Sequence, residues 1–451
     1  MLDREIRERL GSMFKPIDNN YKIWLDCYHG EPYWLKNVND ADYSQSLNLC
    51  ASIASELARL VTMELKTNVD DENLDNIYQK FIRHIRRFTE YGLALGGIVV
   101  KPYVENYSNK IIDIDIVPAN KFVILGFTTF GDINHIVFID RISKRDKKDK
   151  LIYFTRLEEH QIDKEYIITN KAYMSNSSEN LGNEISLEAI EEWSNMAEKT
   201  KVDSDRPLFA YFKNPQANNL DLDSNEGISC FARALSLIQD ADEQYQRIIW
   251  EFKGSELAID ADITTLKANG EIPKGKDRLF RNLGLDMGND GHDFYKVFSP
   301  AIRDSSLFNG LNGILKKIEF ICGLAYGTLS DVEFTAKTAT EINTSQQRSY
   351  STVKDIQNEL ALCLTDFVEV LKFWFKELNI PFKDDCDVSF DFDDSLVVDS
   401  QAEQKIRLQE VAAGILKPEA YLKWRYGVTD EELKEISADI SENRNDVIEE
   451  E

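Results

Sequence analysis

Residues 328–378 read TLSDVEFTAKTATEINTSQQRSYSTVKDIQNELALCLTDFVEVLKFWFKEL, and this stretch decides the architecture. From residue 339 onward it contains neither Gly nor Pro, and its apolar residues recur at helical spacing on one face. At 1.5 Å per residue, a helix over 339–378 extends about 60 Å, which exceeds the radius of one ordinary domain. The preceding residues 328–338 form a polar, Thr/Ser-rich segment. The sequence therefore predicts a polar loop attached to one end of a long helix.

Two shorter helices are predicted before this loop, with a small insertion between them. From Ile228 to Phe252 the apolar residues recur every three or four positions, and only Asp242 interrupts the pattern. A second helix is predicted over about 303–325. The insertion at 257–300 has strand-like segments separated by Gly and Pro, and it is too short to form a large core alone.

The remaining segments divide into helical and strand-like regions. Residues 1–90 are mostly helical by pattern, whereas 97–174 contains six short strand-like segments rich in β-branched and aromatic residues, which predicts an antiparallel sheet. A half-exposed strand is predicted at 387–400, followed by helices in 401–451. The segment RISKRDKKDK at 141–150 has six basic residues, which we interpret as a solvated hairpin tip rather than a nucleic-acid contact. The predicted fold class is α+β.

Composition limits the possible functions. The net charge of −26 disfavours a surface that wraps nucleic acid, although solubility alone also explains an acidic balance. The six cysteines lack metal-ligand spacing and are interpreted as reduced core residues. The N-terminus is charged throughout, and no run of about 18 apolar residues occurs, so neither a secretion signal nor a membrane span is predicted.

No established motif for catalysis, cofactor binding or metal binding is present. The chain lacks a phosphate-binding loop and a nucleophile elbow, and its five histidines do not show metal-ligand spacing. The Asp cluster at 384–394 lacks the Gly and Glu of an EF-hand loop, and we interpret it as the solvated side of a strand rather than a Ca²⁺ or Mg²⁺ site. The sequence predicts no enzyme, cofactor or metal.

Six strings occur in a recognisable order along the chain: IWLDCYHGEPYW (23–34), SLNLCASIASELARLVTMEL (46–65), LFAYFKNPQANNLDLDSNEGIS (208–229), TAKTATEINTSQQRSYSTV (335–353), VSFDFDD (388–394) and LQEVAAGILKPEAYLKWRYGVTDEE (408–432). No single string is diagnostic, but together they cover most of the chain. In their order they resemble a portal protein of a tailed bacteriophage, the head-to-tail connector, of the type found in long-tailed phages of Gram-positive hosts.

The resemblance implies a portal-protein fold with a mixed helical and β-rich wing, a two-helix stem, a small α/β clip, a long wing helix and a helical crown. The implied parts are the wing (1–227), the first stem helix (228–256), the clip (257–302), the second stem helix (303–327), the tunnel loop (328–338), the long wing helix with its strand (339–400) and the crown (401–451). The loop would then reach into a central channel.

The resemblance also implies a function without catalysis. Such proteins form a closed ring, usually of about twelve copies, at one capsid vertex of the virion, and double-stranded DNA passes through it non-specifically during packaging and ejection. The implied partners are a terminase packaging motor, a head-completion adaptor, and the major capsid and scaffolding proteins, with assembly in the host cytoplasm and no membrane. Twelve copies at −26 each carry −312 formal charges, which would repel the duplex and keep it sliding.

Candidate site residues follow from the same resemblance. Residues expected to face DNA in the tunnel loop are Ser330, Asp331, Glu333, Thr335, Lys337 and Thr338, and the expected clip contacts are Lys274, Lys276, Arg278 and Arg281. Lys337 either contacts a phosphate or pairs with Glu333 or Glu341. Lys316 and Lys317 face the channel, the solvated outer side, or a neighbouring subunit.

Two other interpretations remain open. In one, the chain is a cytosolic enzyme or regulator with an unrecognised site in the β-rich unit, and carboxylates with shifted pKa values in a cleft would favour it. In the other, it is a related minor head or adaptor protein. A ring-shaped oligomer with a central hole would favour the portal interpretation.

Overall fold

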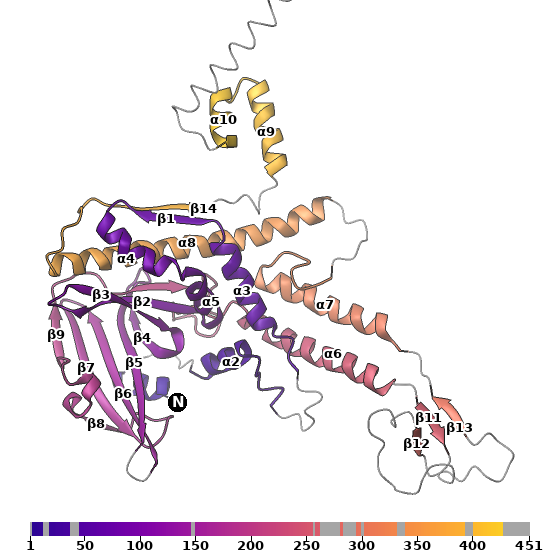
Figure 1. Cartoon of the computed structure of the whole chain (residues 1–451), viewed down its shortest axis with the longest axis horizontal. Helices are drawn as coiled ribbons and strands as arrows, with labels where there is room; N and C mark the ends of the chain where they lie inside the picture. The colour runs from indigo at the N-terminus through magenta and orange to yellow at the C-terminus, as the bar shows by residue number, and fades with distance from the viewer. Residues whose placement is uncertain are drawn as a thin grey trace, which may run out of the picture. The chain divides into compact units, whose positions relative to one another are not determined.

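The computed structural model describes residues 2–11, 18–36, 45–145, 149–255, 258–261, 280–282, 295–298, 302–331, 339–392 and 400–426. The chain divides into two compact units, Met1–Phe390 and Asp391–Glu451. Helices and mostly antiparallel sheets mix within the first unit (Figure 1), which confirms the α+β class. All six cysteines are free and buried, as predicted.

The N-terminal region is mostly helical, as the pattern predicts. Its helices are α1 (Leu2–Leu10), α2 (Asp18–Tyr28), α3 (Leu49–Thr62), α4 (Glu72–Ile82) and α5 (Ile85–Leu95), and the strand β1 (Leu65–Val69) lies between α3 and α4. Helix α3 buries Leu49, Ile53 and Leu57 along one face. Asp71 caps α4, because its side chain accepts a hydrogen bond from the backbone N–H of Leu74 at 2.9 Å.

Two antiparallel sheets follow, and they confirm the predicted β-rich unit. One has the order β10–β2–β3 and contains β2 (Gly97–Asn106), β3 (Ile111–Pro118) and β10 (Ala210–Lys213). The other has the order β4–β5–β6–β7–β8 and contains β4 (Phe122–Phe127), β5 (Ile133–Arg145), β6 (Leu151–Ile162), β7 (Tyr166–Ser175) and β8 (Asn183–Ile185), with β9 (Lys199–Val202) also paired to β7. Residues 141–145 of the basic segment belong to β5, with Arg145 paired to Leu151 of β6, whereas residues 146–148 lie outside the described residues.

The long helix is α8 (Ala339–Glu377), whose 39 residues extend about 58 Å. It packs against α3, α4, β2 and β10 (Figure 1), which confirms the prediction from the Gly- and Pro-free stretch. The ring of Phe367 lies 5.1 Å from that of Phe81, and Trp374 Nε1 donates to the carbonyl of Pro102 at 2.9 Å. The strand predicted after it is β14 (Val388–Phe392), which is half exposed and pairs with β1.

The two shorter helices are α6 (Leu235–Gly254) and α7 (Asp304–Cys322), which lie side by side (Figure 1). Helix α6 begins at Leu235 and not at Ile228, so the predicted start was wrong. The reason is that Cys230 N donates to Leu93 O at 2.9 Å, while Ile228 O accepts from Asn214 Nδ2 at 2.8 Å. These backbone groups are therefore engaged by other elements. Helix α7 ends before 325, because Gly323 has a left-handed backbone with φ of 72°.

The insertion contains β11 (Ala258–Ala261), β12 (Phe280–Asn282) and β13 (Tyr295–Phe298), in the order β12–β11–β13. Strand β11 pairs parallel with β12 and antiparallel with β13, so the strand-like segments predicted at each end of the insertion are confirmed. In the second unit, α9 (Ser400–Ala412) packs against α10 (Pro418–Tyr426), with Arg407 Cζ 4.2 Å from the centroid of the Trp424 ring. Residues 427–451 of the predicted crown lie outside the described residues.

The polar residue that interrupts the apolar pattern of α6 has a structural role. Asp242 is fully buried and accepts hydrogen bonds from Leu47 N at 2.8 Å, Trp34 Nε1 at 3.0 Å and Ser46 Oγ at 3.1 Å. Its carboxylate therefore fastens the segment before α3 onto α6.

We expect Asp242→Ala to lower the free energy of unfolding by about 2–4 kcal/mol, because buried donors lose their acceptor. Urea denaturation measures this change. Asp205→Ala is the control, because Asp205 is exposed, and it should change the free energy by less than about 0.5 kcal/mol. Equal stability of the two variants would show that Asp242 does not hold the segment.

Candidate functional site

The start of the loop after α7 is held by one buried carboxylate. Glu319 is fully buried, and its Oε1 accepts from the backbone N–H groups of Leu329 at 2.6 Å, Ser330 at 2.8 Å and Gly327 at 3.1 Å. Its Oε2 accepts from Ser330 Oγ at 2.8 Å. The groups of Ser330 would otherwise be buried without partners, and the same carboxylate also binds Gly327 and Leu329, so Glu319 determines the backbone path of residues 327–330.

A second side chain of α7 continues this attachment. Asn312 Oδ1 accepts from Asp331 N at 2.9 Å, and its Nδ2 donates to Asp331 O at 3.3 Å. The paired bonds engage both backbone groups of Asp331. Asn312 and Glu319 are seven residues apart, so they lie two turns apart on one face of α7. We name Asn312, Glu319 and residues 327–331 the loop base.

The predicted tunnel-loop residues are only partly described. Ser330 is buried and its hydroxyl donates to Glu319, so this side chain is engaged within the chain rather than exposed for DNA, which differs from the sequence-based expectation. Asp331 is exposed at its side chain. The other four predicted loop residues, Glu333, Thr335, Lys337 and Thr338, lie outside the described residues, and so do Lys274, Lys276 and Arg278 of the predicted clip contacts; Arg281 lies in β12.

The two residues that hold the loop base were not predicted from the sequence. A usable signal existed, because Asn312 and Glu319 are polar residues on the side of α7 that otherwise carries Leu311, Leu315 and Ile318. A polar residue within an apolar face requires a buried partner. The pattern does not name the partner, because the backbone of 327–331 comes into place only when the chain turns back at Gly323.

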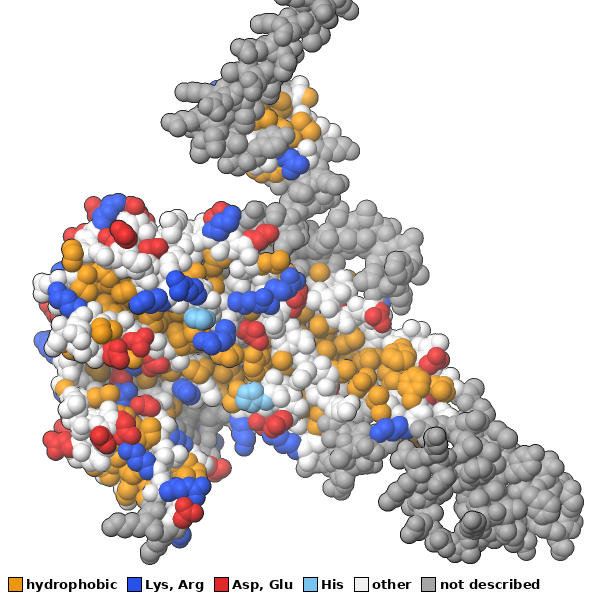
Figure 2. All heavy atoms as spheres, viewed as in Figure 1, with side chains coloured by type: hydrophobic (Ala, Val, Ile, Leu, Met, Phe, Trp, Pro, Cys, Tyr) orange, Lys and Arg blue, Asp and Glu red, His pale blue; other side chains and the backbone are white. Residues whose placement is uncertain are grey.

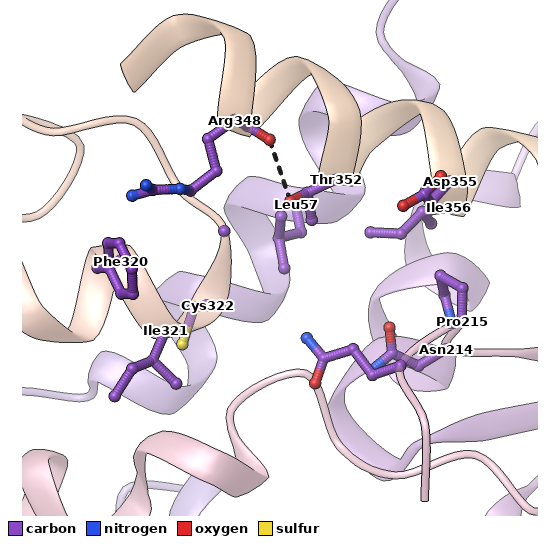
Figure 3. A pocket seen from close by; sticks show the side chains of 12 residues that line it. Leu57, Asn214, Pro215, Phe320, Ile321, Cys322, Arg348, Thr352, Asp355 and Ile356 are labelled. Atoms are coloured by element: carbon purple, nitrogen blue, oxygen red, sulfur yellow. Dashed lines mark hydrogen bonds between the residues drawn. The ribbon is translucent and has the colours of Figure 1, made fainter. Parts of the chain in front are cut away.

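A small cavity of about 270 Å³ lies beside the C-terminal end of α7, where this end meets α8. Figure 3 shows its walls, with Phe320, Ile321 and Cys322 from α7, Arg348 and Thr352 from α8, Leu57 from α3, and Asn214 with Pro215. Arg348 Cζ lies 3.9 Å from the centroid of the Phe320 ring, a cation–π contact between the two helices. Thr352 Oγ1 donates to Arg348 O at 3.2 Å. The two helices that flank the loop are thus joined by a contact beside an incompletely filled space.

The paired lysines of α7 line a different, open groove. This groove of about 520 Å³ is formed by Leu237 of α6 with Lys316, Lys317, Phe320, Ile321 and Tyr326. Lys317 is exposed, whereas Lys316 is half-buried. Both lysines therefore lie on a mostly apolar surface between α6 and α7.

The β-rich unit contains a buried network of titratable groups. Glu158 Oε1 lies 2.8 Å from both Lys101 Nζ and His160 Nε2, and His160 Nδ1 lies 2.6 Å from the hydroxyl of Tyr166. The ionised Glu158 can only accept, so a neutral His160 donates to it from Nε2 and accepts at Nδ1 from the Tyr166 hydroxyl, whose oxygen accepts from Leu208 N at 3.1 Å. The network is buried and its members bind one another, which is typical of a structural role.

The pKa shifts in this network make the folded protein less stable at acidic pH. Burial alone would raise the pKa of Glu158, but the charge of Lys101 and the hydrogen bond from His160 outweigh it and hold the pKa well below 4.5. Burial lowers the pKa of His160 below 6.5, and Glu158 offsets only part of this effect. Below pH 6.5 the unfolded chain therefore binds a proton that the folded chain does not.

We expect the midpoint of urea unfolding to fall as the pH is lowered from 7.5 to 5.5, because the unfolded chain binds a proton on His160 that the buried His160 of the folded chain resists. The contribution of Glu158 is present above pH 4.5 and is lost at lower pH. His160→Gln should reduce the change between pH 7.5 and 5.5, whereas His84→Gln, at an exposed histidine, should leave it unchanged. An unaltered profile in His160→Gln would refute this assignment.

Among the residues that the structure describes, no group of three or more His, Cys, Asp or Glu side chains is arranged to hold a metal ion. Within the same residues, no helix is both long and apolar enough to cross a membrane.

Comparison with known proteins identifies the family. A solved structure entitled "Neck of empty GTA particle computed with C6 symmetry" is similar to 94% of this chain and 98% of its own, with 9% sequence identity and a TM-score of 0.49. No curated protein matches the chain. The family model described as "Phage portal protein, SPP1 Gp6-like" matches residues 11–446, nearly the whole length. The chain with the long helix α8 and the polar loop before it therefore belongs to the SPP1 Gp6-like family of phage portal proteins.

Proposed function

We propose that this chain assembles into a closed ring at one vertex of a phage capsid, and that double-stranded DNA passes through the ring during packaging and ejection. Membership of the portal family supports a role in the virion at the junction of head and tail. The observation that carries the proposal is the loop base, where Glu319 and Asn312 hold the start of a polar loop between α7 and α8. A ring of such copies presents one loop per subunit around a common axis.

The electrostatic balance supports passage of DNA rather than tight binding. Each copy has a net charge of −26, and cationic contacts to phosphates would otherwise resist movement of the duplex. Lys337 is the one cationic residue in segment 328–338, which also contains the acidic residues Asp331 and Glu333. We propose that it makes transient phosphate contacts without reading base sequence.

The parts of the chain take the roles implied by the family. Residues 1–227 with 339–400 form the wing, α6 and α7 form the stem, 257–302 forms the clip, and 401–451 forms the crown. In this arrangement the clip binds a terminase packaging motor and then a head-completion adaptor, through Lys274, Lys276, Arg278 and Arg281. Scaffolding and major capsid proteins contact the ring during assembly, and about twelve copies form it.

Particle mass and shape test this proposal. Mass photometry of the purified full chain, alone and with the phage's scaffolding protein, should show a large cyclic oligomer, and electron-microscope class averages should show a central hole. Monomers and dimers alone, across salt and protein concentrations with scaffolding protein present, would contradict the ring. Turnover of a small substrate by the purified chain would favour an enzyme instead.

A further inference from the structure

Helices α6 and α7 each carry a line of exposed residues. On α6 it consists of Ser236, Asp240, Glu243, Arg247 and Trp250, and on α7 of Ser306, Gly310, Gly313, Lys317 and Phe320. Within each set the spacing alternates between three and four residues, so each set lies along one helix face. We name them the α6 line and the α7 line.

Both lines include aromatic side chains that the chain itself leaves uncovered. Trp250 is 57% exposed and Phe320 is 51% exposed. Figure 2 shows hydrophobic side chains gathered over the region of α6 and α7. An exposed apolar area of this kind is typical of a surface that a partner covers. The α7 line also has room for a partner, because a Cβ added to Gly313 would meet no heavy atom within 4 Å.

Contacts within the chain show that α6 and α7 run in opposite directions and give their approximate levels. Near one end, Arg303 Nη2 lies 2.8 Å from Glu251 Oε2. Further along, Gln244 Nε2 donates to Leu307 O at 3.2 Å. Toward the other end, Leu237 lines the same groove as Phe320. The helices are therefore antiparallel, and the N-terminal end of α6 lies beside the C-terminal end of α7.

A cyclic ring carries these levels over to the neighbouring copy. This step rests on the proposed function. Rotation about a ring axis does not change the height of a residue along that axis. If the helices are aligned with the axis, each residue of the neighbour's α6 therefore lies at the same height as the same residue of the chain's own α6. When Leu237 is taken as level with Phe320, the opposed pairs are Ser236 with Phe320, Asp240 with Lys317, Glu243 with Gly313, Arg247 with Gly310, and Trp250 with Ser306.

These pairs are complementary in size and charge. Four of the five place a large side chain opposite a small residue, which allows two helices to approach and interdigitate. The remaining pair places the carboxylate of Asp240 opposite the ammonium of Lys317, and opposite charges at matched positions fix the register of an interface. The levels rest on the groove that Leu237 shares with Phe320 inside one chain, and not on side-chain size or charge.

We propose that the α6 line of one copy docks on the α7 line of the next copy around the ring, with Asp240 and Lys317 forming an ion pair between subunits. The occupant of this surface is thus a second copy of the chain, and the contact is heterologous, because different faces of the two copies meet. Covering Trp250 and Phe320 removes apolar surface from water, which favours association.

Charge reversal tests the pairing. Lys317→Glu and Asp240→Lys each place like charges opposite one another at every interface, so we expect each variant to reduce the ring fraction in mass photometry by about tenfold or more. The double variant should restore the ring. The control is Lys80→Glu, which makes the same charge change at an exposed lysine of α4 and should assemble like the wild type.

A cross-linking experiment gives a second readout that does not depend on repulsion. The six native cysteines are buried, so a bismaleimide should react mainly with introduced thiols. The variant carrying Asp240→Cys and Lys317→Cys should give a ladder of covalent oligomers on a denaturing gel, and each single variant should not.

The outcomes separate this inference from the proposed function. Wild-type rings together with normal rings in both charge variants, or rings without a cross-linked ladder, would overturn the docking surface and leave the ring intact. Single variants that lose the ring without rescue in the double variant would overturn the Asp240–Lys317 pair. A wild-type chain that forms no ring even with scaffolding protein would refute both proposals.

Discussion

Glu319→Ala is expected to lower the free energy of unfolding by about 3–6 kcal/mol, because three backbone N–H groups and one hydroxyl lose their buried acceptor. Glu319 and Ser330 are both buried, so the loss of the carboxylate leaves the two donors of Ser330 without a partner inside the protein. The affected donors belong to Gly327, Leu329 and Ser330, which form the loop base. Chemical denaturation of the full chain measures the change.

Glu319→Gln is the matched control, because glutamine has nearly the same shape and keeps one oxygen in the position of Oε1. We expect it to cost about 1 kcal/mol or less, since its amide can donate to Ser330 Oγ. If the alanine variant were no less stable than the glutamine variant, the three N–H groups would have other acceptors, and the loop base would not depend on Glu319.

Deletion of residues 332–337 is expected to abolish retention of packaged DNA while leaving folding and ring assembly close to wild type. The segment contains Lys337 and Glu333, two of the residues proposed to meet the duplex. The deletion leaves Ser330 and Asp331 in place, so their hydrogen bonds to Glu319 and Asn312 remain. Nuclease protection of DNA in filled heads measures retention, and mass photometry measures the ring.

A longer deletion, 330–337, separates the two roles of this region. It also removes the anchored residues, so we expect it to lower stability in addition to DNA retention. A Gly/Ser replacement of 332–337 at equal length controls for the shortened connection. Loss of the ring in the 332–337 deletion would show that the segment is part of the subunit interface, and normal DNA retention would contradict its role in the channel.

The candidate site was only partly accessible from the sequence. The absence of Gly and Pro between 339 and 378 predicted α8, and the polar composition of 328–338 predicted the loop before it. The sequence did not reveal that Ser330 is buried, because a serine in a polar segment is expected on the surface. Its buried partner, Glu319, is known only from the structure. Hydrogen bonds depend on distance in space and not on separation in the sequence. The partner of Ser330 lies eleven residues earlier, on the other side of the turn at Gly323.

By itself, the sequence determined the elements whose signal is local. The β-branched strands β2 to β7 and the apolar face of α8 follow from side-chain periodicity, since burial of one face requires that spacing wherever the element packs. Only the tertiary structure decided where α6 begins, why Asp242 is tolerated in its apolar face, and which groups hold the loop base. Each of these depends on contacts between distant residues, such as Asn214 with Ile228 and Trp34 with Asp242, and hydrogen bonds made across the fold leave no periodic trace in the chain.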